Sequence, residues 1–241
     1  MDTNRTVAET AHSRAVREMF SGIAGKYDFL NHFLSLNIDK AWRRKVRQKL
    51  QPILLDPQAV VLDVACGTGD LSFELQHDSK AKVIGTDFCR PMLTVAAEKG
   101  EKNGTGVPFI EADAMNLSFA DASFDALTIA FGLRNLPNFG NGLKELHRVL
   151  KPGGRIAVLE FSSPVVPGFR QLFNFYFNQI LPRVGGLVSG SRGAYEYLPN
   201  SVSKFPAQKA LAALMRETGF TQVEYTNLTG GIAAIHIGRK V

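Results

Sequence analysis

The spacing of hydrophobic and polar positions changes at Val60 of this 241-residue chain. Before that point, apolar side chains such as Val16 and Ile23 recur at helical spacing within residues 14–51, until Pro52 interrupts the pattern. After it, short apolar runs alternate with longer amphipathic stretches. This alternation is typical of strands that are joined by helices.

The alternating region predicts the fold class. Five apolar runs are separated by helical stretches: VVLDV, KVIGTD, VPFIEAD, DALTIAFG and RIAVLEF. A last helix within residues 206–220 leads through a short connection into TQVEYTNL and IAAIHIGRK, which are expected to form an antiparallel edge pair. The sequence therefore predicts a three-layer, doubly wound, Rossmann-like α/β fold with a mostly parallel seven-stranded sheet, N-terminal helices and a helical cap insertion.

Composition narrows the class of protein. The two cysteines, Cys66 and Cys89, are too few for a disulfide framework and favour a reducing, cytoplasmic compartment. The N-terminus MDTNRTVAETAHSRAVREMF lacks the apolar core of a secretory signal, and polar residues interrupt the most apolar stretch, GFRQLFNFYFNQILPRVGGLV. We therefore expect a soluble protein without a membrane span.

Positive charge is concentrated in one stretch. The formal net charge is +6, and KAWRRKVRQKL, from Lys40 to Leu50, carries much of the excess. Such a stretch is compatible with a solvated helix face, with a surface for anionic lipid headgroups or with a nucleic-acid contact. Charge alone does not choose among these three.

The stretch VVLDVACGTGDLSFEL carries the first chemical signal. Its Gly-Thr-Gly turn, residues 67–69, lies between Asp63 and Asp70, and Ser72 stands where the dinucleotide-binding fingerprint requires a third glycine. No Lys or Arg occurs within residues 60–79, so a pyrophosphate at the start of the helix would meet a carboxylate and no base. The turn therefore favours a ligand that approaches the backbone closely and is not strongly anionic.

Two further acids mark the ends of the next predicted strands. Asp87 follows Gly67 by twenty residues and suits two ribose hydroxyls, while Asp113 suits an exocyclic amine beside the Ala114 amide. Ligands of open α/β sheets bind beyond the carboxyl ends of the strands, so these acids are expected to share one crevice. The combination indicates an amino-purine nucleoside with a cationic tail and no phosphate, which S-adenosylmethionine satisfies.

This pattern of acids and glycines resembles the class I methyltransferases. The resemblance implies S-adenosyl-L-methionine as the methyl donor. The cofactor-binding residues that it implies are Asp63, Gly67, Thr68, Gly69, Asp87, Phe88, Asp113, Ala114 and Ala130. Among these, Asp63 would orient the methionine amino group, Asp87 would hold the ribose and Phe88 would pack against the adenine.

Longer stretches resemble one family within that class. YDFLNHFLSLNIDKAW and RVLKPGGRIAVLEFS are similar to the signatures of the ubiquinone/menaquinone biosynthesis C-methyltransferases, as are AFGLRNLP and YEYLPNSVSKFP. The resemblance runs from about Val16 to Arg239. Two positions depart from the family pattern: Asp39 stands where the first signature usually has His, and Ala130 where relatives often carry Ser. A backbone contact from Ala130 to the cofactor would survive that change, whereas a hydroxyl contact would not.

The resemblance implies methyl transfer to a ring carbon of a polyprenylated quinol. It favours demethylmenaquinol as the acceptor, with the benzoquinol of ubiquinone biosynthesis, or both rings, as the alternative. A hydroquinone carbon is already nucleophilic, so catalysis requires positioning and stabilisation of a developing phenolate. Arg134 and Asn135 follow the fourth predicted strand and are candidates for that role, Arg134 mainly through its charge.

The base that accepts a proton is less defined. Tyr27 and Asp28, or His32, are candidates that the N-terminal helices would bring in as a lid. Packing and capping explain Tyr27 and Asp28 equally well, and His32 is interpreted as a structural histidine. No His/Cys cluster has ligand spacing, so no metal is expected.

A lipid-tailed acceptor would give the remaining segments a use. The aromatic stretch FRQLFNFYFNQI would line a route for the isoprenoid tail or pack on the sheet as a buried cap, and it is compatible with a homodimer. The basic Lys40–Lys49 segment and Trp42 would rest on anionic lipid, which predicts a cytoplasmic enzyme peripherally associated with the inner face of the membrane.

Two other functions fit less well. A nucleic-acid methyltransferase would present Asp/Asn-Pro-Pro-aromatic or a Pro-Cys nucleophile, whereas this chain has FGLRNLP, so no nucleic-acid partner is expected. A non-catalytic assembly subunit would leave the acids at the strand ends unexplained.

We expect one domain over residues 1–241. Within it, residues 14–51 would form the N-terminal helical lid and residues 60–162 the cofactor-binding core. Residues 164–205 would form the cap insertion, and residues 206–241 the closing helix and strands.

Overall fold

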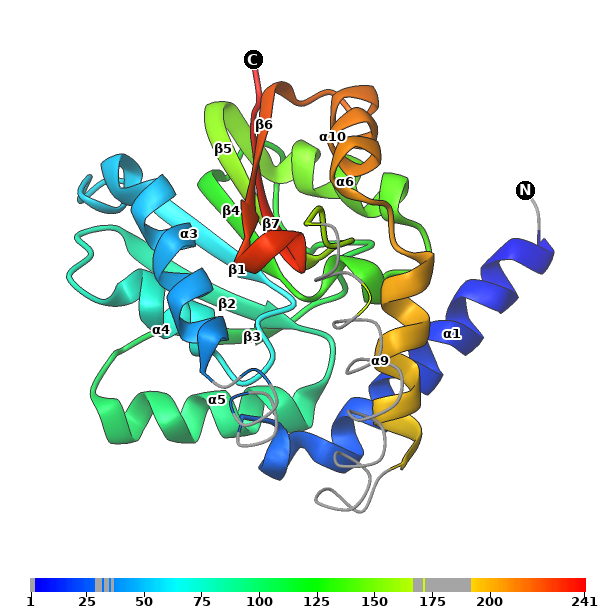
Figure 1. Cartoon of the computed structure of the whole chain (residues 1–241). Coiled ribbons are helices and arrows are strands. Elements are labelled where there is room, and N and C mark those ends of the chain that lie inside the picture. The colour runs from blue at the N-terminus through cyan, green and yellow to red at the C-terminus, as the bar shows by residue number, and fades with distance from the viewer. Residues whose placement is uncertain (1–2, 29–31, 33–34, 36, 167–170, 172–191) are drawn as a thin grey trace.

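The computed structural model describes residues 3–28, 32, 35, 37–166, 171 and 192–241. In this part of the chain, seven strands form one sheet in the order β3-β2-β1-β4-β5-β7-β6 (Figure 1). The strands are β1 (Val60–Val64), β2 (Lys82–Asp87), β3 (Phe109–Glu111), β4 (Phe124–Ala130), β5 (Leu150–Phe161), β6 (Thr221–Leu228) and β7 (Ala233–Arg239). Strands β1 to β5 pair in parallel, and β7 runs antiparallel to β5 and β6. The predicted sheet, mostly parallel with an antiparallel edge, is confirmed.

Helices cover both faces of this sheet. The described helices are α1 (Thr3–Ile23), α3 (Ile38–Leu54), α4 (Asp70–Gln76), α5 (Arg90–Asn103), α6 (Phe139–Val149), α9 (Arg192–Lys204) and α10 (Gln208–Glu217), with short 3-10 turns η1 (Ala24–Lys26), η2 (Leu133–Asn135) and η4 (Thr229–Gly231). Apolar side chains of α3 and α4 pack in one buried cluster, and those of α6 and α10 pack in another on the opposite face. The three layers of the predicted Rossmann-like fold are therefore present.

Strand β1 shows how the sequence pattern produces these layers. Leu62 and Val64 point into the cluster beneath α6 and α10, while Val61 points into the cluster beneath α3 and α4. Successive side chains of a strand alternate between faces, so a strand that is buried on both faces has a continuous apolar run. Asp63 is the one charged residue in that run, and it lines a cavity at the end of the strand.

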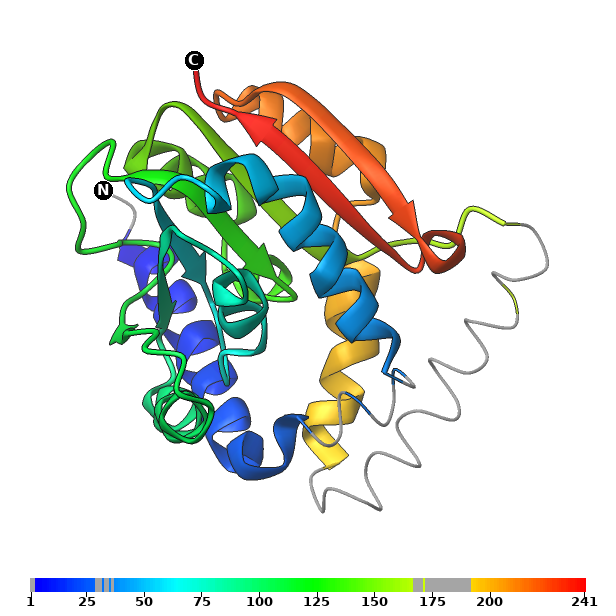
Figure 2. The ribbon, with the colours of Figure 1, turned by 90° about the vertical axis from the view of Figure 1, so that its left-hand side faces the viewer.

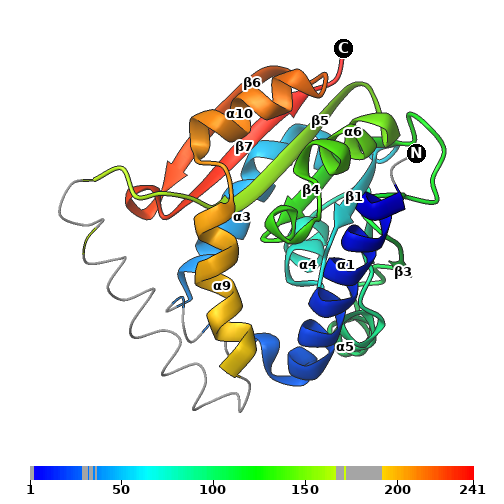
Figure 3. The same cartoon turned by 90° about the vertical axis from the view of Figure 1, so that its right-hand side faces the viewer.

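The order of the strands locates the site. The sheet reverses its winding between β1 and β4, and ligands of such sheets bind beside that reversal, beyond the carboxyl ends of the strands. Figures 2 and 3 show α1 and α9 on the side where the parallel strands end. Segments from both ends of the chain therefore flank the place at which β1 and β4 finish.

Some predicted boundaries differ from the structure. The N-terminal helix α1 begins at Thr3, earlier than the predicted lid at residue 14. Strand β3 ends at Glu111, because its pairing with β2 stops where β2 turns into α5 after Asp87. Asp113 therefore lies in the turn after the strand, where it forms an isolated bridge with Asn116.

Several expectations remain predictions. Most of the aromatic stretch FRQLFNFYFNQI lies outside the described residues, and so do parts of the predicted lid. The division of residues 1–241 into a lid, core, cap and closing segment also stays a prediction. Among the helices of the described part, none is long and apolar enough to cross a membrane.

Candidate active site

Two loops meet at the reversal of the sheet. Ala65 directly follows β1 and Phe131 directly follows β4, and both adopt left-handed backbone angles, with φ of 53° and 55°. Such angles are uncommon for residues other than glycine and gather at functional sites. A Cβ atom on Gly132 would lie 2.5 Å from the Cβ of Ala65, so only glycine lets the two loops approach this closely.

Two adjoining cavities open above these loops. The first cavity has a volume of about 130 Å³, and residues of α1, α3, α9 and the β1 and β4 loops line it. The second cavity, of about 60 Å³, is lined by α1 and by the loops after β1, β2, β3 and β4. The residues that line both are Phe20, Tyr27, Ala65, Gly67, Ala130 and Phe131. The cavities therefore form one site with two halves.

The second cavity gathers the polar residues that follow β2 and β3. Asp87, Phe88, Asp113 and Ala114 line it, as the sequence predicts. The carboxylate of Asp87 accepts the backbone N–H of Gly67 and of Cys89, each at 2.8 Å, and burial raises its pKa. Each oxygen keeps capacity for a second donor, so the carboxylate can also accept hydroxyls of a ligand.

A charged side chain from α1 lies next to Phe88, an aromatic residue of this half. The guanidinium of Arg17 lies 5.3 Å from the centroid of the Phe88 ring, and Ser13 also lines the second cavity. Asp113 is exposed and accepts the N–H of Met115 at 2.9 Å, which fixes the turn that presents Ala114. The second cavity thus has an aromatic face, a buried carboxylate and the backbone of the Asp113–Ala114 turn.

Asp63 borders the first cavity from below. It is 1% exposed, and its two oxygens accept hydrogen bonds from the Ser72 hydroxyl at 2.6 Å and the Thr128 hydroxyl at 2.7 Å. Burial raises its pKa to about 6. Ser72 stands where the dinucleotide fingerprint has its third glycine. Its hydroxyl donates to the Asp63 carboxylate and so helps to hold this acid at the cavity.

Asp70 contacts basic side chains from distant segments, which spacing along the sequence did not reveal. Its carboxylate contacts Lys99 Nζ at 2.5 Å, Arg43 Nη2 at 3.3 Å and His32 Nε2 at 3.4 Å. These basic side chains come from other parts of the chain, so the absence of bases within residues 60–79 gave no indication of them. The Asp70 carboxylate is therefore paired with a lysine and an arginine of the protein itself.

Asp39 is buried in the same group of charges. It accepts hydrogen bonds from Arg43 Nη1 at 2.6 Å, His32 Nδ1 at 2.8 Å and Ser35 Oγ at 2.7 Å. Among the described residues, His32, Asp39 and Asp70 have ligand atoms within 4.8 Å of one another, a cluster that sequence spacing did not reveal. Arg43 already contacts both carboxylates, so a guanidinium supplies the positive charge there.

Two of the expected site residues lie behind the cavity lining. Asp28 is not among the described residues that line either cavity; it accepts hydrogen bonds from the Thr68 hydroxyl and from Lys99 Nζ, the latter at 2.6 Å. Its role as a base stays a prediction. Gly69 caps α4 with a φ of +84°, and a Cβ there would lie 2.8 Å from the Phe109 ring. Gly69 therefore fixes the shape of the turn whose other residues, Gly67 and Thr68, line the first cavity.

Arg134 lines the first cavity as expected, but it has a buried partner that the sequence argument missed. Its Nη1 donates to Glu160 Oε1 at 2.9 Å and to the carbonyl of Phe131, and its Nε has no hydrogen-bond partner among the described residues. Glu160 is 1% exposed, and burial raises its pKa against the opposing charge of Arg134. A buried acid at the end of β5 is the same signal that identified Asp63, and it could have found Glu160.

Asn135 and Tyr197 connect the two halves to α9. The Tyr197 hydroxyl donates to Asn135 Oδ1 at 3.1 Å, and Asn135 Nδ2 donates to the Phe131 carbonyl at 3.3 Å. Tyr197 lines the first cavity and Asn135 the second. Burial raises the pKa of Tyr197, and the charge of Arg134 acts in the opposite direction. Tyr197 stands in the stretch YEYLPNSVSKFP and was not among the predicted site residues.

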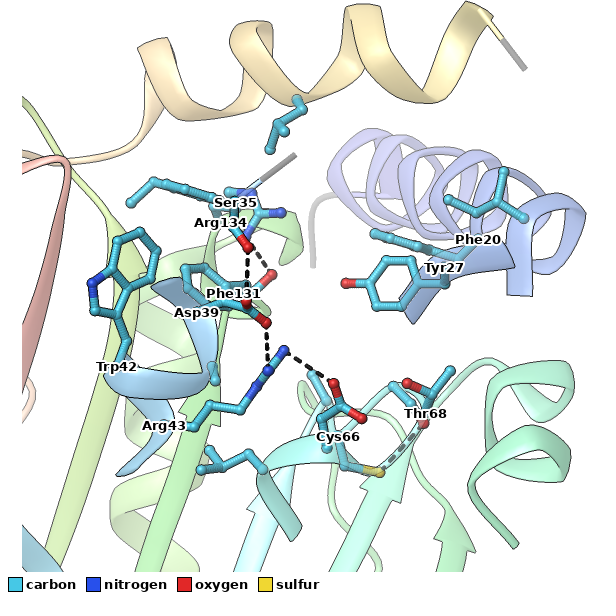
Figure 4. A pocket seen from close by; sticks show the side chains of 18 of the residues that line it. Phe20, Tyr27, Ser35, Asp39, Trp42, Arg43, Cys66, Thr68, Phe131 and Arg134 are labelled. Carbon is cyan, nitrogen blue, oxygen red and sulfur yellow. Dashed lines mark hydrogen bonds and ion pairs between the residues drawn. The ribbon is translucent and has the colours of Figure 1, made fainter. Parts of the chain in front are cut away.

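Three aromatic rings form one wall of the first cavity. The ring centroids are separated by 6.0 Å for Trp42 and Phe131, 6.4 Å for Trp42 and Phe161, and 4.8 Å for Phe131 and Phe161. Figure 4 shows Trp42 and Phe131 on one side of this cavity, with Phe20 and Tyr27 on the other. Trp42 is 4% exposed and donates to the Thr229 hydroxyl at 3.0 Å, so the expectation that it rests on lipid is wrong.

The sequence of the whole chain is similar to one methyltransferase family. A family model described as the ubiE/COQ5 methyltransferase family matches residues 7–240. The demethylmenaquinone methyltransferase of Thermus thermophilus is 49% identical over 92% of this chain and 100% of that protein. That of Deinococcus radiodurans is 46% identical over 94% and 93%. The ubiquinone/menaquinone biosynthesis C-methyltransferase UbiE of Geotalea uraniireducens is 41% identical over 96% and 98%.

Solved structures share the fold at low sequence identity. A SAM-dependent methyltransferase from Thermotoga maritima, described as a possible histamine N-methyltransferase, gives a TM-score of 0.66 at 19% identity, covering 93% of this chain and 99% of that one. The [4+2]-cyclase SpnF gives 0.62 at 20% identity, covering 82% and 81%. These likenesses concern the fold alone.

Proposed function

The chain belongs to the ubiE/COQ5 methyltransferase family, and from this premise we propose that it methylates a ring carbon of a polyprenylated quinol with S-adenosylmethionine as donor. The acceptor that we propose is demethylmenaquinol, which becomes menaquinol. Two relatives named for demethylmenaquinone support this choice. A third, named for ubiquinone and menaquinone biosynthesis, keeps the benzoquinol, or both rings, as the second candidate.

The second cavity suits the adenosine part of the donor. Asp87 offers two carboxylate oxygens for ribose hydroxyls, Phe88 offers a ring face, and the Asp113–Ala114 turn offers an acceptor and an amide donor. The first cavity continues past Gly67 and Thr68 to the buried carboxylate of Asp63, which suits an ammonium group. Ala130 borders both halves, so its backbone can contact the donor without a hydroxyl. When bound, S-adenosylmethionine supplies an electrophilic methyl group.

The single observation that carries the proposal is the aromatic wall beside Arg134 in the first cavity. A flat dihydroxy ring can pack against Trp42, Phe131 and Phe161, and the guanidinium of Arg134 lies 5.4 Å from the centroid of the Phe161 ring. Methylation of a ring carbon forms a carbon–carbon bond, breaks the donor's carbon–sulfur bond and releases the ring proton. A phenolate that develops on the ring would be stabilised by the positive charge of Arg134.

Three side chains would hold the acceptor in line with the donor. Tyr27 lines both cavities and therefore stands where the methyl group must pass. Tyr197 and Asn135 are hydrogen-bonded to each other and frame Arg134 from the side of α9. Glu160 orients the guanidinium through its hydrogen bond to Nη1. We assign these residues to positioning, because effective alignment of two substrates contributes much of the rate of such a reaction.

The acceptor is lipid-tailed, and we also propose a peripheral contact with anionic lipid. Lys40, Arg44, Lys45 and Lys49 are exposed on α3, and the described part of the chain gives none of them an ion-pair partner. Juxtaposed cations of this kind are attracted to anionic membranes. Replacing all four with Gln should reduce sedimentation with vesicles containing anionic lipid, and neutral vesicles serve as the control. The homodimer remains a prediction.

The experiment that tests the proposed reaction uses labelled S-adenosylmethionine under reducing conditions with detergent. Demethylmenaquinol, the demethylated methoxy-polyprenyl-benzoquinol and bulk RNA are offered in parallel. The proposal predicts label on one or both quinols, and the distribution decides the ring. Label on RNA alone would contradict it. Bound donor without any transfer would indicate a non-catalytic subunit instead.

A further inference from the structure

We propose that Lys99 is a positioning residue for the methyl-donor site. It holds the N-terminal segment, Tyr27–Asp28, against the Gly67–Thr68 turn and thereby slows dissociation of the donor. Its ammonium nitrogen lies 2.6 Å from Asp28 Oδ2 and 2.5 Å from Asp70 Oδ1. Lys99 lies on α5, whereas Asp28 follows η1 and Asp70 begins α4. One side chain thus joins three segments. The inference rests on the proposed function, because it assumes that this site holds S-adenosylmethionine.

Asp28 connects Lys99 to the turn itself. Its other carboxylate oxygen accepts a hydrogen bond from the hydroxyl of Thr68, which is 2% exposed and lines the first cavity. The neighbouring Tyr27 ring lies 3.9 Å from the position of a Cβ on Gly67. The Tyr27–Asp28 segment therefore lies directly on the Gly67–Thr68 turn, and Lys99 holds it there by its charge.

Loss of the Lys99 charge should affect Asp28 more than Asp70. Asp70 keeps a second cation, because Arg43 contacts it as well, and the His32 imidazole also lies within 3.4 Å of it. Asp28 has Lys99 as its only cationic partner among the described residues. Removing the ammonium group would leave Asp28 facing Asp70 without a shared counter-charge, whereas Asp70 would stay paired. The N-terminal segment would then loosen while α4 and its turn remain in place.

If Lys99 only stabilised the fold, its loss would lower the melting temperature. The positioning role predicts no such change. The side chain of Lys99 is 25% exposed, and partly exposed ion pairs contribute little to global stability. Loss of Lys99 should therefore leave the melting temperature almost unchanged. An effect on donor release without an effect on unfolding would separate the positioning role from general stabilisation.

Dissociation of S-adenosylhomocysteine measured by stopped flow tests the proposal. We expect Lys99→Met to release it about tenfold faster, the equivalent of about 1.4 kcal/mol, with Lys99→Arg within about twofold of the parent chain. Lys102→Met is the matched control, since Lys102 is exposed on the same helix. Added salt should speed release from the parent chain but not from Lys99→Met, because salt screens the partly exposed pair.

A double-mutant cycle identifies the partner. Asp28→Asn should speed release to the same extent, and the double variant should be no faster than either single variant. Unchanged release in Lys99→Met, or additive effects of the two changes, would overturn the proposal. These outcomes are separable from a failure of the proposed function, which would show as absence of S-adenosylhomocysteine binding by the parent chain or of methyl transfer to any quinol.

Discussion

The two halves of the site are built in different ways. The carboxylates of the second cavity lie at or just beyond strand ends, since Asp87 ends β2 and Asp113 lies two residues after β3. The wall of the first cavity combines Trp42, Phe131, Phe161 and Tyr197, which are far apart in the chain. Short strand-and-turn units are enough to present the carboxylates of the second cavity, whereas the wall of the first cavity requires the assembled fold. This difference also predicts that changes in the two halves separate donor binding from turnover.

Asp87 gives the largest expected effect on donor binding. Asp87→Ala removes the oxygens proposed for the ribose and leaves the buried N–H groups of Gly67 and Cys89 without an acceptor. Each hydrogen bond from a ribose hydroxyl to this carboxylate would contribute about 1.5–3 kcal/mol to binding, so losing two costs about 3 kcal/mol or more. We expect the dissociation constant of S-adenosylmethionine, measured by calorimetry, to rise at least about 100-fold. Tight binding by this variant would mean that the second cavity does not hold the ribose.

The Arg134–Glu160 pair gives the largest expected effect on turnover. Removing Arg134 alone would leave Glu160 buried and unpaired, a destabilisation of about 3–5 kcal/mol. The double variant Arg134→Met/Glu160→Gln avoids that buried charge. We expect it to bind S-adenosylmethionine within about threefold of the parent chain and to lose about 100-fold in turnover, as when a transition-state donor is removed. Calorimetry and transfer of label to the quinol measure the two effects. If donor binding and turnover fell by similar factors, the two cavities would not have separate roles, and this prediction would be wrong.

Tyr197 predicts a smaller change in the acceptor half. Tyr197→Phe removes one hydroxyl that donates to Asn135. We expect kcat/KM for the quinol to fall about fivefold, since one hydrogen bond contributes about 1 kcal/mol. Binding of S-adenosylmethionine should not change. Tyr225→Phe, on the outer strand β6, is the control. A changed donor affinity in Tyr197→Phe, or the same loss in the control, would count against this assignment.

Asp63 predicts a pH dependence of donor binding. Its pKa is raised by burial to about 6, so below that pH the free protein increasingly carries a proton on this carboxyl. An ammonium group favours the ionised form, and the proton must leave before it binds. Affinity for S-adenosylmethionine should therefore fall as pH drops from 7 to 5, by at most about tenfold per pH unit. Asp63→Asn should bind more weakly and lack this dependence; an unchanged pH profile in that variant would assign the titration to another group.

Site residues could be predicted from the sequence where they lie at the end of a strand or in the turn after it. Asp63, Asp87 and Gly67 could be located because a strand, a turn and an acid are adjacent in the chain, and the structure places all three at the cavities. Alternating burial along β1 similarly explains why the sheet could be predicted. Such features depend on neighbours in the sequence, which a pattern can reveal.

The remainder depends on contacts between distant segments. Lys99 and Arg43 reach Asp70 from other helices, and the partner of Arg134 lies 26 residues further along the chain. Trp42 shows the same limit, because its position beside basic residues suggested a lipid contact although it packs against the Phe131 and Phe161 rings. Spacing along a sequence does not encode which side chains meet after folding.

Fluorescence of the chain's single tryptophan tests the division of the site most directly. Trp42 lies in the wall of the first cavity, so demethylmenaquinone, the oxidised acceptor, should quench its emission saturably when S-adenosylhomocysteine is already bound. S-adenosylhomocysteine alone should change the emission little, and free N-acetyltryptophanamide corrects for absorption and collisions. Saturable quenching by the quinone is the result that the account predicts. Quenching no greater than that of the free tryptophan derivative, or a response to the donor product alone, would contradict the placement of the acceptor beside Trp42.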